Sequence, residues 1–417
     1  MSLTTDHVGV RVFSNLSDTA ATIDVRDSTI IGISAPLPNI QAANEAAFPI
    51  GEPVRIAMDD PVQLAKLGPG AVYDAIRVMR MEGIVTDIPF VRAATKADPE
   101  EQIGAIAGDA NLGTGMYGLL NAKSALGIEP GILLSPGYTA ARPGNAKNPI
   151  VQAMTAVADI IIDCIGMADT PDTSREAAAA WALDFAAVRN IVAMYPKALV
   201  NLDGSVVTRP ASSILAAMTV RRDKEVGNPY KAAWNRGSLA LGGTSQKVSY
   251  HDGRVEGDAN YLNFRGVGTF IENNLLWAPF TTATDPTTVG YRSIKRIRTR
   301  RAIEKSFLRS MRAYAAQDLG PHLVTVMFRT LDDALDAPIA AGALIKGSEV
   351  IYDASLNTGS ALKKGALKLK LRFEETPELV DLGLYTEPQP EAYDVLTGQI
   401  RTAIEGLGNS SLRFLAA

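Results

Sequence analysis

The chain has 417 residues, of which 47% are hydrophobic and 21% charged, with a formal net charge of −4. This composition is that of a folded globular protein and excludes a disordered or collagen-like chain. The slightly acidic balance gives no sign of general nucleic-acid binding. At roughly 150 residues per domain, the length predicts about two to four domains. The single cysteine, Cys164, excludes an intramolecular disulfide, and its apolar neighbours predict a buried thiol.

The beginning of the chain shows neither a secretion signal nor a membrane anchor. No basic segment is followed by a long apolar core, and no apolar run in the sequence approaches about 18 residues. We therefore expect no direct membrane insertion, and synthesis in the cytosol with release by lysis. In the first segment, Val8, Val10 and Val12 alternate with other residues, which predicts a strand without a local partner.

Two α/β regions follow this strand. In residues 25–105, short apolar runs predict strands at 29–34, 53–58 and 84–92, with helices at 62–67 and 72–82. From residue 106 onward, alanine-rich helical stretches alternate with expected strands at 131–135, 160–165 and 191–194. This alternation predicts a mostly parallel sheet covered by helices. Thr173 and Glu176 have the spacing of a capping box, which predicts a helix over 174–188.

An order of strand, loop and helix often carries an active site, but the residues for one are missing. Ser135 ends an apolar strand, yet no GxSxG motif surrounds it and the histidines are scattered. No loop has Walker spacing, and no GxGxxG motif follows a strand. We therefore expect no enzymatic activity and no cofactor or metal. Four aspartates are expected as helix caps and loop charges rather than metal ligands: Asp159, Asp163, Asp169 and Asp172.

Residues 291–319 predict a long helix with two opposed faces. Its apolar face carries Ile303, Phe307, Met311 and Tyr314, and its basic face carries Arg298, Arg301, Lys305, Arg309 and Arg312. Between residues 292 and 312 there are nine basic residues and one acid, Glu304. Like charges one turn apart repel each other by roughly 0.2–0.5 kcal/mol per pair. The basic face is therefore either a solvated surface or a contact surface for an anionic partner.

The last third of the chain predicts a mixture of strands and helices. Two short strands are expected about Asn273 and Asn274, and an apolar strand-like run at 321–327 leads into a helix over 331–344, with a break at Pro338. That helix carries acids at Asp332, Asp333 and Asp336. The cleanest alternation of apolar and charged residues lies at 367–373, and a second alternation follows at Val380, Leu382 and Leu384.

The order of these parts resembles the contractile tail sheath proteins of phages and of phage-like injection devices such as R-type bacteriocins. The resemblance spans nearly the whole chain and is carried by several short stretches: 7–10, 29–36 (TIIGISAP), 131–138 (GILLSPGY), 263–277, the helix after Tyr291, and 365–385. It implies an α/β and α+β multidomain fold. The implied parts are an N-terminal arm (1–24), a small α/β domain (25–105), a subtilisin-like α/β domain without catalytic function (106–262), a C-terminal α+β domain (263–388) and a C-terminal arm (389–417).

The resemblance also implies a mechanical function. Family members stack as rings, six-fold in the family, around an inner tail tube and contract to drive the tube through the host envelope. The implied partners are copies of the chain itself, the tube protein, and the baseplate and tail terminator proteins, all in the virion tail. The two arms are expected to donate strands to neighbouring subunits through Val8, Val10, Val12, Tyr393, Val395 and Ile400. The basic face and the acidic residues Asp332, Asp333 and Asp336 are expected to contact the tube or a neighbouring subunit.

Two other functions are compatible with single features of the sequence. A hydrolase-type enzyme would be centred on Ser135. A nucleic-acid-binding protein would use the arginine-rich helix 292–312, and its affinity would depend steeply on salt.

Overall fold

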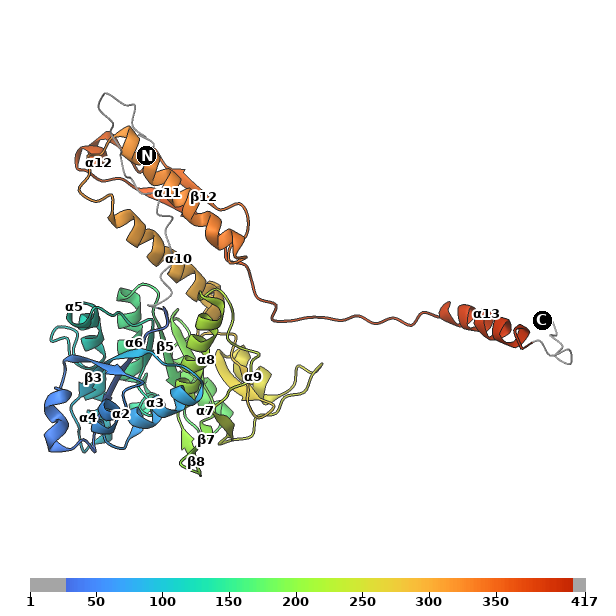
Figure 1. The fold of residues 1–417 in the computed structure, drawn as a ribbon, viewed down its shortest axis with the longest axis horizontal. Helices are drawn as coiled ribbons and strands as arrows, with labels where there is room; N and C mark the ends of the chain where they lie inside the picture. Colours follow the sequence, from blue (N-terminus) through green and yellow to red (C-terminus); the bar gives the residue numbers. More distant parts are fainter. Residues whose placement is uncertain (1–27, 408–417) are drawn as a thin grey trace, which may run out of the picture. The chain divides into compact units, whose positions relative to one another are not determined.

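The computed structural model describes residues 28–407 of the chain (Figure 1). These residues form two units, one ending at Glu378 and the other beginning at Leu379. The first unit contains the sheets and most of the helices. The second contains one helix, α13 (Ala392–Glu405).

An eight-stranded sheet is the centre of the first unit. Its strand order is β11-β10-β6-β5-β4-β1-β3-β2, with the two edge strands β2 and β11 antiparallel and all other pairings parallel. The strands are β1 (Ile31–Pro36), β2 (Pro53–Ala57), β3 (Asp87–Ala93), β4 (Ile132–Leu134), β5 (Ile165–Asp169), β6 (Ile191–Met194), β10 (Val267–Ile271) and β11 (Leu275–Trp277). The expected mostly parallel sheet is thus confirmed.

The parallel strands are buried almost throughout and mostly apolar, because helices cover both faces of the sheet. In β4, Ile132 and Leu134 face one hydrophobic core, whereas Leu133 faces the other. The first core contains α2 (Pro61–Lys66), α3 (Ala71–Met81) and α8 (Ala211–Val226). The second contains α4 (Pro99–Ala107), α6 (Pro149–Ile160), α7 (Arg175–Leu183) and α9 (Asp258–Phe264). A short helix, α5 (Ala122–Leu126), precedes β4.

Several of these helices begin with the same local signal, an aspartate or asparagine followed by proline. The side-chain oxygen accepts hydrogen bonds from the first free backbone N–H groups, and proline fits the first helical position. The pairs are Asp60–Pro61 for α2, Asp98–Pro99 for α4 and Asn148–Pro149 for α6. Helix α7 begins at Ser174, whose Oγ accepts from Ala177 N at 3.1 Å, one residue later than the expected cap at Thr173.

The first unit also contains two smaller sheets. Strands β7 (Ala198–Leu202), β8 (Ser205–Arg209) and β9 (Leu241–Thr244) form an antiparallel sheet with the order β8-β7-β9. Strands β12 (Glu349–Tyr352) and β13 (Leu369–Arg372) form a two-stranded antiparallel sheet, which confirms the alternation seen in the sequence at 367–373.

The last part of the first unit is built on a pair of long helices. Helices α10 (Ile294–Arg312) and α11 (Pro321–Ala340) lie side by side (Figure 1). Together with the β12–β13 sheet, they surround a third hydrophobic core around Phe307, Leu331 and Leu335. A short helix, α12 (Gly359–Lys363), lies between the two strands of this sheet in the sequence.

Three expected elements differ in the structure. The apolar run at 160–165 is not a strand, because Ile160 ends α6 and β5 begins only at Ile165. Residues 321–327 are the first two turns of α11 rather than a strand, and the helix continues through Pro338 to Ala340. Residues 379–391 contain no helix or strand.

The large sheet takes strands from residues 25–105 and from residues 106–262. Strand β1, from the first range, pairs with β4, from the second, in parallel register, with Ile31 opposite Ile132. Strand β10 extends the same sheet into the range that was expected to begin the C-terminal domain. One sheet therefore contains strands from three of the predicted parts, and the domain boundaries stay a prediction.

Candidate functional site

The two-faced helix α10 is the feature from which the site is built. Ser293 caps its N-terminus, with Oγ accepting from Arg296 N at 3.2 Å. The apolar face behaves as expected, because Ile303 and Phe307 are buried and Met311 packs against the same core. Tyr314 follows the helix, and its hydroxyl forms a hydrogen bond of 2.7 Å with Thr330 Oγ1 of α11. The apolar face thus joins α10 to α11.

Arg298, at the centre of the basic face, is used inside the chain. Its guanidinium forms a two-pronged pair with the Asp223 carboxylate of α8, with Nη1 to Oδ1 at 3.0 Å and a second, shorter contact. The Arg298 side chain is 5% exposed and that of Asp223 is 0% exposed. A charge this deeply buried is not available to an outside partner, so Arg298 fastens α10 to α8.

Lys305 forms the second internal attachment of the basic face. Its Nζ lies 3.0 Å from Glu129 Oε2, and Lys123 contacts the same carboxylate at 3.2 Å. Burial works against ionisation of Glu129, but Lys305 and Lys123 outweigh it and hold the pKa of Glu129 below its usual range. Asp163 lines one small cavity together with Lys305 and Arg309. The basic face thus meets three acids of the α/β body: Asp223, Glu129 and Asp163.

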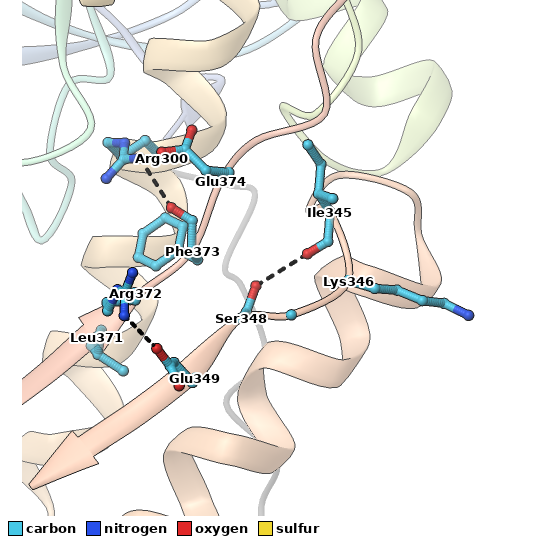
Figure 2. A pocket seen from close by; sticks show the side chains of 10 residues that line it. Arg300, Ile345, Lys346, Ser348, Glu349, Leu371, Arg372, Phe373 and Glu374 are labelled. Carbon is cyan, nitrogen blue, oxygen red and sulfur yellow. Dashed lines mark hydrogen bonds and ion pairs between the residues drawn. The ribbon is translucent and has the colours of Figure 1, made fainter.

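A second row of basic residues ties α10 to the chain that follows β13. Arg296 Nη2 lies 3.2 Å and Arg300 Nε 2.5 Å from the buried carboxylate of Glu375. Lys295 Nζ donates to the carbonyl oxygen of Thr376. The Arg300 guanidinium also lies over the Phe373 ring and donates to the Phe373 carbonyl at 3.3 Å (Figure 2). Basic residues that the sequence did not single out therefore carry much of the docking.

The hollow in Figure 2, of about 440 Å³, lies beside this row. Arg372 pairs with Glu349 across its β12–β13 wall at 2.9 Å, and Lys346 extends away from the other labelled side chains. Because Arg300 and Arg372 are both paired within the chain, this hollow offers no concentrated charge for a ligand.

The rest of the expected electrostatic surface is distributed between two helices. Arg301 pairs with Glu304 of the same helix at 3.6 Å, Arg309 is half-buried, and Arg312 is exposed. On α11 the acidic residues Asp332, Asp333 and Asp336 lie exposed, on the face opposite Leu331 and Leu335. Within residues 28–407, no ion pair joins these three aspartates to the basic face. The two candidate surfaces are therefore separate.

The strand-donating residues have two different outcomes. Val8, Val10 and Val12 lie outside the described residues. Tyr393, Val395 and Ile400 lie on helix α13 and not on a strand. The reason is the spacing of the apolar side chains: Tyr393, Leu396, Ile400 and Ile404 recur every three or four residues, which is the helical period.

Comparisons with known proteins find relatives of one kind. No protein-family model matches the chain. A prophage major tail sheath protein of Pseudomonas aeruginosa strain UCBPP-PA14 is 26% identical over 379 residues, covering 88% of this chain and 93% of that protein. The major tail sheath protein of Serratia phage KSP20 is 25% identical over 386 residues, covering 90% and 93%. The chain is thus similar to tail sheath proteins over nearly its whole length.

Two solved structures of contractile injection systems share the fold of this chain. The sheath complex of the extracellular contractile injection system PVC, in the contracted state, superposes with a TM-score of 0.65 at 12% identity and covers 94% of this chain. A chain of the six-fold symmetrised anti-feeding prophage baseplate gives a TM-score of 0.64 at 16% identity and covers 92%. Both matches include the whole of the other chain.

The two relatives are named as tail sheath proteins, which disfavours the hydrolase alternative centred on Ser135. Its Oγ is buried and has no hydrogen-bond partner among the described residues. His251 lies in an exposed loop and His322 on the exposed side of α11, whereas His7 lies outside the described range. Residues 28–407 contain no group of three or more metal-ligating side chains, and none of their helices is long and apolar enough to cross a membrane.

Three of the four aspartates expected as helix caps and loop charges bond to other parts of the chain, although Asp159 lies within α6 and Asp169 ends β5. Asp169 accepts from the backbone N–H of Ser212 at 2.9 Å and from its hydroxyl at 2.6 Å, which fixes the start of α8 to the end of β5. Asp172 accepts from Lys197 N at 3.1 Å. Asp159 accepts from Asn190 Nδ2 at 3.0 Å. The predicted buried thiol is also confirmed, and burial raises the pKa of Cys164.

The hydroxyls of Ser135 and Ser212 are both buried, but only that of Ser212 has a hydrogen-bond partner within residues 28–407, so their alanine variants can be compared. Ser135→Ala removes a buried hydroxyl that has no partner, so we expect the free energy of unfolding to rise by about 1 kcal/mol. Ser212→Ala removes the hydroxyl that donates to the buried Asp169 carboxylate, so we expect a loss of about 1.5–3 kcal/mol. Urea unfolding followed by tryptophan fluorescence measures both. Equal losses would contradict the assignment of Ser135 as an unpartnered turn residue.

Proposed function

We propose that this chain is the subunit of a contractile tail sheath, of a phage or a related injection system, and that its copies stack as rings around an inner tube. The observation that carries the proposal is the identity to a prophage tail sheath protein over 93% of that protein's length. The fold match to a contracted sheath complex supports it. No nucleotide or cofactor is part of the proposal, since contraction can draw on better burial and charge pairing between subunits.

Six-fold rings are the proposed symmetry. The anti-feeding prophage structure that this fold matches is a six-fold symmetrised baseplate, and we carry that symmetry over to this chain. The proposed partners are other copies of the chain, an inner tube protein, and baseplate and terminator proteins. The site of action would be the virion tail, assembled in the host cytoplasm. The region 106–262, with the parallel strands β4, β5 and β6, is proposed as the subtilisin-like domain that has lost catalysis.

Strand exchange between copies is the proposed joint. The β12–β13 sheet has only two strands, a size that is marginally stable alone, so both of its edges could accept a strand from another copy. Val8, Val10 and Val12 are the proposed donors at one end. At the other end, Val380, Leu382 and Leu384 replace the helical residues Tyr393, Val395 and Ile400, because they alternate and are exposed. Main-chain hydrogen bonds make such a joint tolerant of rotation.

The ion pairs that α10 forms within the chain reduce the number of charged residues available for contacts with other molecules. Arg298 and Lys305 are bonded to Asp223 and Glu129 of the same chain, so they support the subunit itself. We assign the outward contacts to the exposed Arg312 and to Asp332, Asp333 and Asp336 on α11. The same internal pairing disfavours nucleic-acid binding through helix 292–312.

Electron microscopy of the purified full-length chain tests the proposal. Striated cylinders at high protein concentration are the expected result. Deletion of residues 1–20 is expected to leave a folded monomer, with unchanged circular dichroism, that forms no cylinders. Normal cylinders from the deletion variant would refute the role of the N-terminal arm. A full-length chain that stays monomeric at every concentration would count against the sheath assignment.

A further inference from the structure

An apolar groove on the first unit is lined by the N-terminal half of α11 and the region of β12, α12 and β13. We call this surface the apolar groove, and its volume is about 660 Å³. Its walls include Leu319, Val324, Phe328, Tyr352, Leu362 and Leu367. Leu319, Tyr352 and Leu362 are exposed, Tyr352 to 43%. A concave apolar surface of this kind marks a binding site for another apolar surface.

Lysines adjoin two residues of the apolar groove, Leu362 and Leu367, in the sequence. The segment 359–372 contains five basic residues and no acid. Arg372 pairs with Glu349, but Lys363, Lys364, Lys368 and Lys370 are exposed, and no ion pair is found for them among residues 28–407. The groove therefore favours a partner with an apolar face and negative charge around it.

Helix α13 of the second unit has these properties. Its side chains Tyr393, Leu396, Ile400 and Ile404 form one apolar stripe at helical spacing, and Leu407 continues it. Tyr393 is 72% and Ile400 51% exposed, and no residue of α13 is buried. An isolated helix of 14 residues is marginal in water. Its apolar stripe therefore requires a partner surface.

The charges of the second unit complement the lysines. Residues 379–407 contain five acids (Asp381, Glu387, Glu391, Asp394 and Glu405) and one base (Arg401), so their net charge is 1 − 5 = −4. The dimensions also agree. From Tyr393 to Ile400 the stripe spans about 10 Å, as does the groove wall from Pro321 to Phe328, at about 1.5 Å per helical residue.

We propose that α13 of one copy binds the apolar groove of a second copy, as an amphipathic helix in a hydrophobic groove. The choice of a second copy rests on the proposed sheath function, because a sheath brings many copies of both surfaces together. The apolar stripe provides the contact area, and the acids flanking it are placed to meet Lys363 and Lys364, which adjoin the groove residue Leu362. This contact adds a helical joint to the proposed exchange of strands.

Disulfide trapping between two differently tagged full-length chains tests the contact. One chain carries Thr325→Cys in the groove and the other Ala403→Cys beside the stripe of α13. The native Cys164 is buried and gives no background. We expect a disulfide-linked heterodimer on mixing under mild oxidation. The matched control replaces Val395, which lies on the same helix but off the stripe, with cysteine. We expect it to link at a rate lower by on the order of tenfold.

Two further variants test the chemistry of the contact. Ile400→Gln on the stripe is expected to lower the linking rate of the Thr325→Cys and Ala403→Cys pair by on the order of tenfold, whereas Val395→Gln is expected to leave it unchanged. Reversal of charge at Lys363 and Lys364 to glutamate is expected to slow linking most at low salt. Equal effects of Ile400→Gln and Val395→Gln would refute the stripe.

The outcomes separate this inference from the sheath assignment. Cylinders that form normally without the heterodimer would overturn the inference and leave the sheath function intact. A bond within one chain of the Thr325→Cys/Ala403→Cys double variant, with no heterodimer from the mixture, would show that the occupant comes from the same chain and would overturn it too. So would preferential linking of Leu382→Cys to Thr325→Cys, which would place residues 379–385 in the groove. Failure to form cylinders at all counts against the sheath itself.

Discussion

Replacement of Arg298 by alanine is expected to lower the free energy of unfolding by about 3–5 kcal/mol. The substitution leaves the Asp223 carboxylate, 0% exposed, without its two-pronged partner in the interior. An uncompensated buried charge is among the most destabilising changes a single substitution can cause. Urea unfolding of the variant and of the native chain at the same pH measures the loss.

An exposed ion pair of the same type supplies the control. Arg372 and Glu349 also lie within hydrogen-bond distance, at 2.9 Å, but their side chains are 64% and 50% exposed. Arg372→Ala is therefore expected to cost no more than about 1 kcal/mol. The double variant Arg298→Met/Asp223→Leu is expected to recover most of the loss, because it removes both buried charges together. If Arg298→Ala cost as little as Arg372→Ala, the docking of α10 through this pair would be refuted.

Replacement of Asp163 by asparagine is expected to stabilise the chain above neutral pH. Asp163 lies between α6 and β5, and burial raises its pKa from 3.8 to about 7. Lys305 and Arg298 of α10 oppose the shift, whereas Asp223 of α8 and Glu129 add to it. Arg309 lines the same cavity, and Tyr230 is a further buried neighbour.

The sign of the effect follows from proton linkage. Between about pH 4 and pH 7 the folded chain holds the Asp163 proton that the unfolded chain has lost, so the stability falls as the pH rises. The loss is complete above about pH 7 and amounts to about 4 kcal/mol at 1.36 kcal/mol per pKa unit. Asp163→Asn stays neutral, so its advantage over the native chain should grow from nearly zero at pH 4 to this value at pH 8.

The backbone at this position provides the control. Asp163 has φ of +68°, a left-handed conformation that asparagine adopts readily. Alanine there costs roughly 1–2 kcal/mol at every pH, so Asp163→Ala should show the same pH dependence as Asp163→Asn with a constant offset. Unfolding curves at several pH values separate the two effects. A difference between Asp163→Asn and the native chain that does not change with pH would contradict the raised pKa.

The periodic features of the chain could be predicted from its sequence. Ile303 and Phe307 were expected on an apolar face and are buried, because a three- and four-residue spacing has one interpretation in a helix of this length. The short apolar runs at 131–135 and 191–194 were expected as strands of a parallel sheet and pair there through β5. Such patterns can be predicted because the spacing of the apolar residues depends on which side of the helix or strand is buried.

The partners of the basic face could not be predicted. Asp223, Glu129 and Glu375 lie far from α10 in sequence, and no local spacing marks an acid as the partner of a distant arginine. A row of basic residues looks the same in sequence whether it faces solvent, another molecule or acids of its own chain. The run 160–165 shows a second limit, since an apolar stretch can serve a helix end and a turn as well as a strand.

Helix α10 forms ion pairs on two sides. Arg298 and Lys305 pair with acids of the α/β body, and Arg296 and Arg300 pair with an acid in the segment after β13. A rotation imposed on the β12–β13 sheet would thus be transmitted through α10 to the large sheet with little deformation between them. Residues 28–378 should then travel as one stiff block during shortening of a sheath. The angular adjustment between successive layers would fall to the linkers that leave the block.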